Sequence, residues 1–286
     1  MTAAELTRVL GRQVTTVERR PSPYRTSFPL EELRVELADG TRLQLVRKDL
    51  RRSALGAIAH RVKPQFLHDP GREIEAYRLL TGRRLGTPVY YGAGRGWILL
   101  EKVPGVELAQ IGELEDWRRA ARWLARLHAT FAGTPPSSRI LLDHDAAYYR
   151  LWPQRAAARA PEVSWIAARY EPVVERLVAL PRTLIHGEFY ASNVLVAGER
   201  VAPVDWEMAA VGAGLVDLAA LVTGWKGEER AAILAAYPGV DDLAMAACRL
   251  HLALQWLGWS TDWTPPPAQA YDWLGEVREA AERLGL

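Results

Sequence analysis

The sequence predicts an α+β fold with two lobes, a small lobe built on a sheet of about five strands and a larger, mostly helical lobe. Two strand-like runs between residues 33 and 48 flank an Asp-Gly turn, and two more lie between residues 86 and 103. Pro104 and Gly105 then interrupt the pattern, as turn residues at a boundary do. Beyond them, apolar side chains recur at helical spacing over residues 115–131, which predicts the first helix of the larger lobe.

Length and charge agree with this organisation. A chain of 286 residues can form two modest domains, which we place at residues 1–103 and 104–286. Its 49% hydrophobic and 24% charged residues are ordinary for a globular protein. Because the net charge is only +2 and the charges are interspersed, we expect no nucleic-acid partner.

Cysteine usage and apolar tracts indicate the compartment. Cys248 is the only cysteine, so no disulfide can form within the chain, which favours a reducing environment. The apolar tract at residues 208–225 is interrupted by Asp217 and by glycines and is too short to span a membrane. No charged segment followed by an apolar one opens the chain. We therefore expect a cytoplasmic protein without a membrane partner.

The small lobe begins with a predicted short helix and strand over residues 6–20 and a loop over residues 20–28. In the hairpin that follows, side chains alternate, so Val46 and Lys48 share one face and Arg47 lies on the other. Lysine is scarce among the 36 basic residues of the chain, and its four lysines are Lys48, Lys63, Lys102 and Lys226. A compact ammonium group that must reach a phosphate is one reason to use lysine where arginine is the default.

Residues 49–70 are a basic connection of weak periodicity, for which we expect a helix and loop in contact with solvent, with contact to a substrate or phosphate as the alternative. Residues 69–80 begin with turn signals and continue at helical spacing. Glu73 and Glu75 lie near the start of this helix. From the pattern alone, a helix glutamate is most often solvated.

The larger lobe opens with a helix whose apolar stripe ends in His128, which we expect to be a core histidine. Residues 241–259 predict another helix. The C-terminal part is rich in large aromatic side chains, namely Trp225, Trp256, Trp259, Trp263, Tyr271 and Trp273. They could stack on a ligand, but we favour a core position for most of them.

The stretch from Thr183 to Val196 contains two short apolar runs that flank a polar loop. A turn at residues 197–200 then folds the chain back toward an acidic pair, so we expect a hairpin with functional groups at both ends. Glu188, Asn193 and Asp205 lie in the loop and at the end of the next strand, where they can converge. Phosphoryl transfer needs such a set, because a carboxylate positions the attacking hydroxyl while hard oxygen ligands bind Mg²⁺.

At this stretch the chain resembles the aminoglycoside phosphotransferase and choline kinase-like family of small-molecule kinases. The loop of that family reads H-G-D-x-x-x-x-N, and its second acidic motif reads I-D-W-E. The matching residues are His186, Gly187, Asn193, Asp205, Trp206 and Glu207. Glu188 departs from the pattern, since the family has Asp there. The resemblance implies a protein-kinase-like fold, with a nucleotide-binding first lobe and a catalytic and substrate-binding second lobe.

The resemblance also implies that ATP, or GTP, binds between the lobes. Val46 would pack against the base, and the backbone at Glu101 and Val103 would bind the adenine. Lys48 would bind phosphates and would be held by Glu73, with Glu75 as the alternative. The loop before the hairpin offers three hydroxyl side chains for phosphate contacts, Ser22, Thr26 and Ser27. An ordinary surface loop is the alternative there.

In the larger lobe, the resemblance implies that Asn193 and Asp205 bind Mg²⁺ with help from Glu207. Glu188 would orient and deprotonate a hydroxyl of a small-molecule substrate, and His186 would support the loop through hydrogen bonds.

Asp217 follows Glu207 by only ten residues, so the chain lacks a long activation segment, which favours a small-molecule kinase over a protein kinase. The resemblance implies that Asp217 anchors the catalytic loop, with helix capping as the alternative. Aminoglycosides, sugars, choline-like amines and amino-acid alcohols all fit as acceptors. Both a monomer and a homodimer agree with the sequence.

Glu188 keeps further hypotheses open. Its extra methylene moves the carboxylate by about one bond length, and a displacement of about 1 Å can lower a rate about a hundredfold. A nucleotide-binding pseudokinase with a regulatory role is therefore the alternative to an active enzyme. A binding module that uses the aromatic C-terminal part is a third hypothesis.

Overall fold

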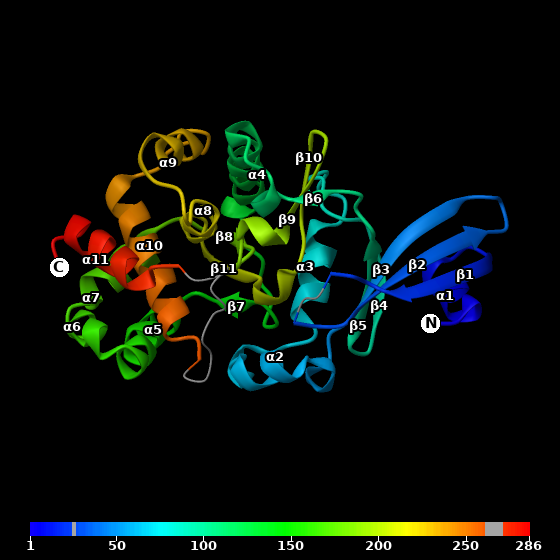
Figure 1. The fold of residues 1–286 in the computed structure, drawn as a ribbon, viewed down its shortest axis with the longest axis horizontal. Coiled ribbons are helices and arrows are strands. Elements are labelled where there is room, and N and C mark those ends of the chain that lie inside the picture. The colour runs from blue at the N-terminus through cyan, green and yellow to red at the C-terminus, as the bar shows by residue number, and fades with distance from the viewer. Residues whose placement is uncertain (25–26, 261–270) are drawn as a thin grey trace.

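The computed structural model describes residues 1–24, 27–260 and 271–286. It has the predicted α+β architecture, with a small sheet lobe and a larger helical lobe at opposite ends of the long axis (Figure 1). The N-terminus lies on the sheet lobe and the C-terminus at the far end of the helical lobe.

The small lobe contains one antiparallel five-stranded sheet in the order β1-β2-β3-β5-β4. Its elements are α1 (Ala3–Leu10), β1 (Val14–Pro21), β2 (Leu30–Leu37), β3 (Arg42–Asp49), β4 (Tyr90–Gly94) and β5 (Trp97–Glu101). The predicted Asp-Gly turn joins β2 to β3, and Gly40 adopts the positive φ of 81° that such a turn requires. Helix α1 packs on the sheet through Leu6, against Leu33 and Leu45.

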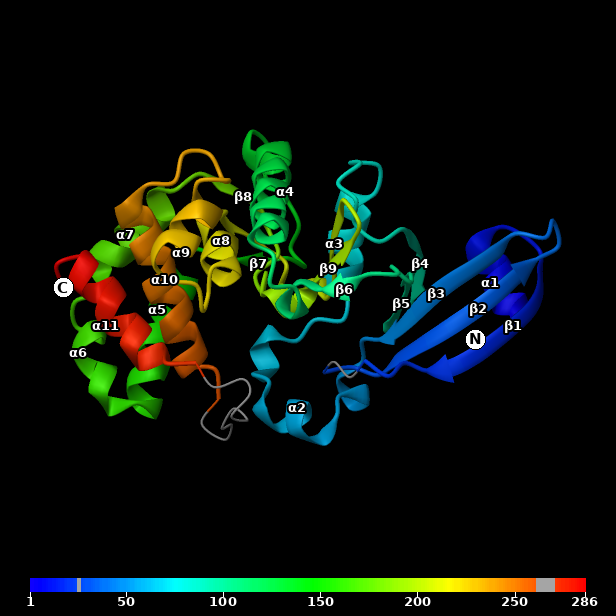
Figure 2. The same cartoon turned by 45° about the horizontal axis from the view of Figure 1, so that its top comes forward.

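Two helices separate β3 from β4, namely α2 (Ala57–Val62) and α3 (Arg72–Leu80). Figure 2 shows α2 and α3 between the sheet and the helical lobe. The buried Arg72 starts α3 and donates hydrogen bonds to the backbone oxygens of Leu67, Ile140 and Glu207. This side chain therefore connects α3 to the larger lobe.

The larger lobe is mostly helical. Its helices are α4 (Leu114–Ala132), α5 (Ala146–Arg159), α6 (Ser164–Ala167), α7 (Glu171–Ala179), α8 (Leu215–Leu221), α9 (Gly227–Leu234), α10 (Asp242–Leu257) and α11 (Trp273–Arg283). His128 on α4 is 4% exposed, which confirms the expected core position. Of the aromatic residues in the C-terminal part, Trp225, Trp256, Trp259 and Trp273 pack half-buried against the core, whereas Trp263 lies outside the described residues.

Two small sheets hold the stretch around the catalytic loop. One has the order β10-β9-β6, with β6 (Val106–Glu107), β9 (Val194–Ala197) and β10 (Arg200–Pro203). The other has the order β7-β11-β8, with β7 (Leu142–Asp143), β8 (Arg182–Ile185) and β11 (Ala210–Ala213). Strands β9 and β10 form the expected hairpin. Strand β8, the first apolar run, pairs instead with β11, so the loop at residues 186–193 crosses from one sheet to the other.

Among the described residues, no helix combines the length and the apolar character that crossing a bilayer would require.

Candidate active site

A cavity of about 360 Å³ lies between the two lobes. Its small-lobe wall includes Val46, Lys48, Leu100 and the connection from Glu101 to Gly105, and its floor includes Asn193, Leu195, Val204 and Asp205 of the larger lobe. The size is in the range of small-molecule sites. The cavity therefore lies between the end of β3 and the hairpin after the loop at residues 186–193.

Lys48 connects the lobes through two carboxylates. Its Nζ lies 2.6 Å from Oε2 of Glu73 on α3 and 2.5 Å from Oδ1 of Asp205. Lys48 is 4% exposed and Glu73 is 2% exposed, so this cluster is shielded from water. The structure thus brings together the lysine, the helix glutamate and the second acidic motif, as the family resemblance implies.

The pKa values in this cluster reflect burial and neighbouring charge. Burial disfavours the ammonium form of Lys48, but Asp205 and Glu73 outweigh it and raise the pKa of Lys48 above its usual value. Burial raises the pKa of Glu73, and the ammonium of Lys48 offsets only part of that shift. For Asp205, the charge and hydrogen bond of Lys48 outweigh burial and lower the pKa of the carboxyl. Asp205 is therefore a carboxylate at neutral pH.

The catalytic loop is anchored by Asp217 on α8. One carboxylate oxygen accepts a hydrogen bond from the His186 amide at 2.7 Å, and the other accepts one from the Gly187 amide at 2.9 Å. His128 Nε2 lies 3.3 Å from the same carboxylate. Gly187 has a φ of 82°, and a Cβ there would lie 2.2 Å from the backbone oxygen of Met208, so only glycine fits this turn.

His186 is held by the backbone on both sides of its ring. Nε2 lies 2.9 Å from the Val204 oxygen, and the Glu188 amide donates to Nδ1 at 3.3 Å. Burial lowers the pKa of His186, so the ring is neutral and donates through Nε2. This arrangement matches the supporting role that the resemblance implies for His186.

Two oxygen-bearing side chains on the cavity wall fit a Mg²⁺ ion. Asn193 uses its Nδ2 to donate to the Glu188 backbone oxygen at 2.9 Å, which leaves its amide oxygen free as an acceptor. Asp205 uses Oδ1 for Lys48 and has a second carboxylate oxygen. Among the described residues no group of three acidic, histidine or cysteine side chains forms a complete metal site. Such a partial set suits Mg²⁺, which usually takes one or two protein carboxylates together with phosphate and water.

Glu188 lies beside this wall and does not line the large cavity. Within the described ranges its carboxylate has no hydrogen-bond or ion-pair partner. Burial, together with the charge of Glu207, raises the pKa of Glu188 to about 8, and Lys63 opposes this shift. Its charge also acts on the buried hydroxyls of Tyr148 and Tyr190. The carboxyl of Glu188 therefore keeps its proton near neutral pH.

Lys63 is a residue of this site that the sequence reasoning missed. We expected residues 49–70 in contact with solvent, but Lys63 is 6% exposed and forms an ion pair with Glu207. That expectation was wrong for Lys63 because the loop after α2 folds over the second acidic motif of the larger lobe. Glu207, predicted to assist the metal, thus has a lysine partner and does not line the large cavity. Two signals in the sequence pointed to Lys63, namely the scarcity of lysine and the basic character of residues 49–70, for which phosphate contact was the alternative to a solvated loop.

Of the residues that we predicted to contact the nucleotide, some line the cavity and one does not. Val46, Glu101 and Val103 line the cavity, and no hydrogen bond to the Val103 amide is found in the described part of the chain. Ser27 does not line the cavity, and its backbone oxygen accepts from the Gly56 amide. Ser22 lines the cavity instead, and Thr26 lies outside the described residues.

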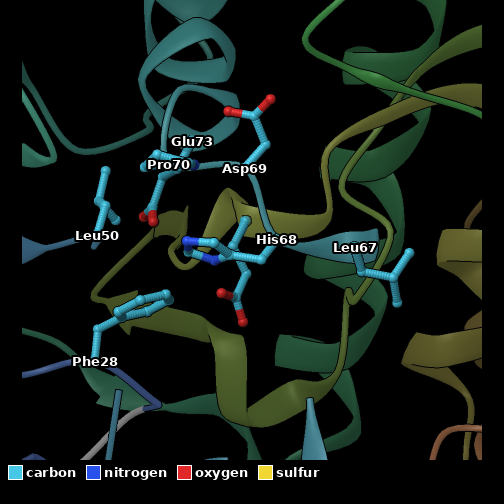
Figure 3. Close-up of a pocket in the computed structure, with 8 residues that line it drawn as sticks. Phe28, Leu50, Leu67, His68, Asp69, Pro70 and Glu73 are labelled. Atoms are coloured by element: carbon cyan, nitrogen blue, oxygen red, sulfur yellow. The ribbon is translucent and has the colours of Figure 1, made fainter. Parts of the chain in front are cut away.

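A second, much smaller cavity of about 10 Å³ shares the lining residue Glu73 with the large cavity (Figure 3). Phe28, Leu50, His68 and Glu207 contribute to its walls. The Phe28 and His68 rings lie 5.9 Å apart. This volume holds about one water molecule and is too small for a substrate.

The fold and the lysine-carboxylate cluster define a protein of the kinase-like phosphotransferase class. The model of the phosphotransferase enzyme family matches residues 50–251. The chain therefore belongs to the phosphotransferase enzyme family. No curated protein sequence matches it.

Solved structures of the same fold cover almost the entire chain. Choline kinase LicA from Streptococcus pneumoniae is 14% identical with a TM-score of 0.62, over 99% of this chain and 96% of that one. Macrolide 2'-phosphotransferase MphH from Brachybacterium faecium is 20% identical with a TM-score of 0.59, over 98% and 95%. The streptomycin-ATP-APH(2")-IIa ternary complex gives 14% identity and a TM-score of 0.56, over 99% and 96%. At these identities the likeness establishes the fold.

Proposed function

We propose that this protein transfers the γ-phosphoryl group of ATP to a hydroxyl of a small molecule. The observation that carries the proposal is the position of Lys48, which contacts Glu73 at 2.6 Å and Asp205 at 2.5 Å at the end of the cavity between the lobes. A lysine held by a helix glutamate beside a metal-binding aspartate is the arrangement with which kinases bind nucleotide phosphates.

The adenine would occupy the part of the cavity lined by Val46, Leu100 and Val103. The amide of Val103 is available there as a hydrogen-bond donor. Lys48 would hold the phosphates, and Asn193 and Asp205 would hold Mg²⁺. When bound, Mg²⁺ would neutralise phosphate charge at this end of the cavity.

Glu188 is the proposed base. The acceptor oxygen forms a bond to the γ-phosphorus, and the hydroxyl proton passes to the Glu188 carboxylate. The bond from the γ-phosphorus to the bridging oxygen breaks, and its electron pair leaves with ADP. Because the pKa of Glu188 is about 8, the carboxylate form that this proton transfer requires increases as the pH rises toward 8.

A small-molecule acceptor is supported by the short connection after the second acidic motif. Only β11 lies between Glu207 and the start of α8, so these described residues contain no activation segment that could hold a protein substrate. The structures similar to this chain include a choline kinase and a macrolide 2'-phosphotransferase. An amine-bearing or sugar-like alcohol is accordingly the first class to screen.

The first test is a thermal-shift series with ATP, GTP and their Mg²⁺ complexes on the wild type and on Asp205→Ala. A ligand that binds only the native state raises the melting temperature, so we expect a Mg²⁺-dependent shift that the variant loses. A folded wild type that no nucleotide stabilises would contradict the proposal.

A nucleotide-binding pseudokinase is the second candidate, and the replacement of the family Asp by Glu188 favours it. Nucleotide binding without ADP formation over a broad panel of alcohols would support this candidate. Glu188→Asp also distinguishes the kinase from the pseudokinase. If the shorter side chain increases turnover, the other groups of the site are competent for phosphoryl transfer.

A further inference from the structure

We propose that Lys63 is a second phosphate-binding lysine, which holds the γ-phosphoryl group while Lys48 holds the phosphates nearer to the nucleoside. The inference rests on the proposed function and assigns a role in the reaction to the segment between β3 and α3.

The position of Lys63 is the first argument. Its side chain forms an ion pair with Glu207, and its charge also acts on Glu188 and Asp205. Of these carboxylates, Glu188 is the proposed base and Asp205 is a proposed metal ligand. The ammonium of Lys63 is therefore placed among the groups that must surround the transferred phosphoryl group.

A shared aromatic ring is the second argument. The Nζ of Lys48 lies 5.4 Å from the centroid of the Phe28 ring, and the Nζ of Lys63 lies 5.3 Å from it. Phe28 also forms a wall of the small cavity together with Glu73 and Glu207 (Figure 3). Both lysine-carboxylate pairs thus meet at one side chain, which belongs to the loop before β2 where kinases cover the phosphates.

The burial of Lys63 and the number of its hydrogen-bond donors give the third argument. Lys63 is only 6% exposed, and a buried ammonium group is unfavourable unless its donors are used. Lys63 has three donors, and Glu207 is its only ion-pair partner within the described residues. Two donors remain, and phosphate oxygens are suitable acceptors for them.

The charge balance gives the fourth argument. In the transition state, negative charge spreads over the three equatorial oxygens of the phosphoryl group. The neighbouring carboxylates Glu188, Asp205 and Glu207 oppose that charge, and Lys48 is already shared between two carboxylates. During transfer Lys63 would remain on the equatorial oxygens and exchange no proton, since the hydroxyl proton passes to Glu188 and the bridging electron pair leaves with ADP.

The alternative role for Lys63 is to neutralise Glu207 without touching the nucleotide. The two roles differ in how they discriminate between nucleotides. A lysine on the γ-phosphoryl group contributes to binding of ATP but not of ADP, whereas a structural pair contributes equally to both.

The experiment is isothermal titration of MgADP and of the Mg²⁺ complex of the non-hydrolysable β,γ-imido ATP analogue. For Lys63→Met we expect the affinity for the analogue to fall about 10- to 100-fold, with the ADP affinity within about twofold of the wild type. Lys48→Met should weaken both ligands. Lys226→Met, which removes the exposed lysine before α9, is the matched control and should weaken neither.

Equal losses for ADP and the analogue, or no loss for either, would overturn the inference. Should Lys63→Met leave Glu207 unpaired and fail to fold, the double variant Lys63→Met with Glu207→Gln removes both charges and is compared with Glu207→Gln alone. A wild type that binds neither nucleotide refutes the proposed function itself. If instead the wild type binds both ligands and Lys63→Met keeps the same preference for the analogue over ADP, only the inference about Lys63 is refuted.

Discussion

The catalytic loop has two sides that differ in how their polar groups are satisfied. The anchor side consists of His128, His186, Gly187 and Asp217, and the reactive side consists of Lys48, Lys63, Glu188, Asp205 and Glu207. On the anchor side, Asp217 is fully buried and both of its carboxylate oxygens accept backbone hydrogen bonds. On the reactive side, three carboxylates lie close together, and the pKa of Glu188 is raised to about 8.

This difference between the two sides indicates how the site tolerates the backbone strain at Asp205 on the reactive side. Asp205 has a φ of 66°, an unusual conformation for a residue with a side chain. Such a residue persists when the surrounding contacts fix it. Here one such contact comes from the anchor side, where His186 Nε2 donates to the oxygen of Val204 next to Asp205, while the reactive side presents its charges. Variants on the reactive side should therefore alter chemistry, and variants on the anchor side should alter stability.

The largest effect is expected for Asp205→Ala on the reactive side. Removing a proposed metal ligand and a partner of Lys48 should lower turnover by about 10⁴-fold, equivalent to about 5.5 kcal/mol in the barrier. The measurement is ADP formation with an acceptor identified by screening, alongside a denaturation curve that should remain close to the wild type. Activity within tenfold of the wild type would mean that the metal assignment is wrong.

Asp217→Ala tests the anchor side. It leaves the buried amides of His186 and Gly187 without their acceptor, so we expect the free energy of unfolding to fall by about 3 kcal/mol. Denaturant unfolding measures this loss. Asp242→Ala removes an exposed aspartate at the start of α10 and should change stability by less than about 0.5 kcal/mol. Similar effects of the two substitutions would contradict the distinction between the two sides.

Gly187→Ala sharpens the comparison within the loop. The new Cβ would meet the backbone oxygen of Met208, in addition to the strain of the positive φ. We expect a loss of about 2 kcal/mol in stability. Gly198→Ala is the matched control, because Gly198 also has a positive φ but has no atom within 4 Å of the added Cβ. Its cost should be about 1 kcal/mol, and an equal cost for both would mean that the close approach at Gly187 is unimportant.

Glu188→Gln gives the smallest expected effect on stability, and this effect depends on pH. The folded pKa of Glu188 is about 8 and its ordinary value is 4.5. Between these values the native state holds a proton that the unfolded chain has released, so this carboxyl makes the wild type less stable as pH rises. Gln does not titrate, and we expect the melting temperature of the variant to exceed that of the wild type by at least about 2 °C at pH 8, but not at pH 4.

Glu228→Gln, at an exposed position on α9, controls for the loss of one charge. A difference between Glu188→Gln and the wild type that stays constant from pH 4 to pH 8 would show that Glu188 is not the titrating group.

Much of the small lobe could be predicted because its signals are local. The alternation of side chains in β3 put Val46 and Lys48 on one face, and both line the cavity. The fold class was confirmed, as was the pairing of β2 with β3 through the Asp-Gly turn. The pairing of Lys48 with Glu73 was also anticipated, but from the family resemblance and not from periodicity.

The remaining features depend on contacts between distant parts of the chain. Lys63 lies in a segment without periodicity, and its burial arises only when that segment meets Glu207 of the larger lobe. Strand β8 was expected in the same unit as the hairpin, but its partner β11 comes after the second acidic motif. Likewise, the position of Ser27 relative to the cavity depends on how the loop before β2 closes, which residue types alone do not determine.

The unequal exposure of the lysines also makes the protein a convenient substrate for chemical conjugation. Lys48 and Lys63 are buried, and Lys102 is half-buried in an ion pair with Glu32. Lys226 is exposed and lies at the start of α9 in the larger lobe. An amine-reactive dye or linker should therefore couple at Lys226 and at the N-terminal amine. These two attachment points lie on different lobes, so a donor and an acceptor fluorophore placed there would report any change in the distance between the lobes.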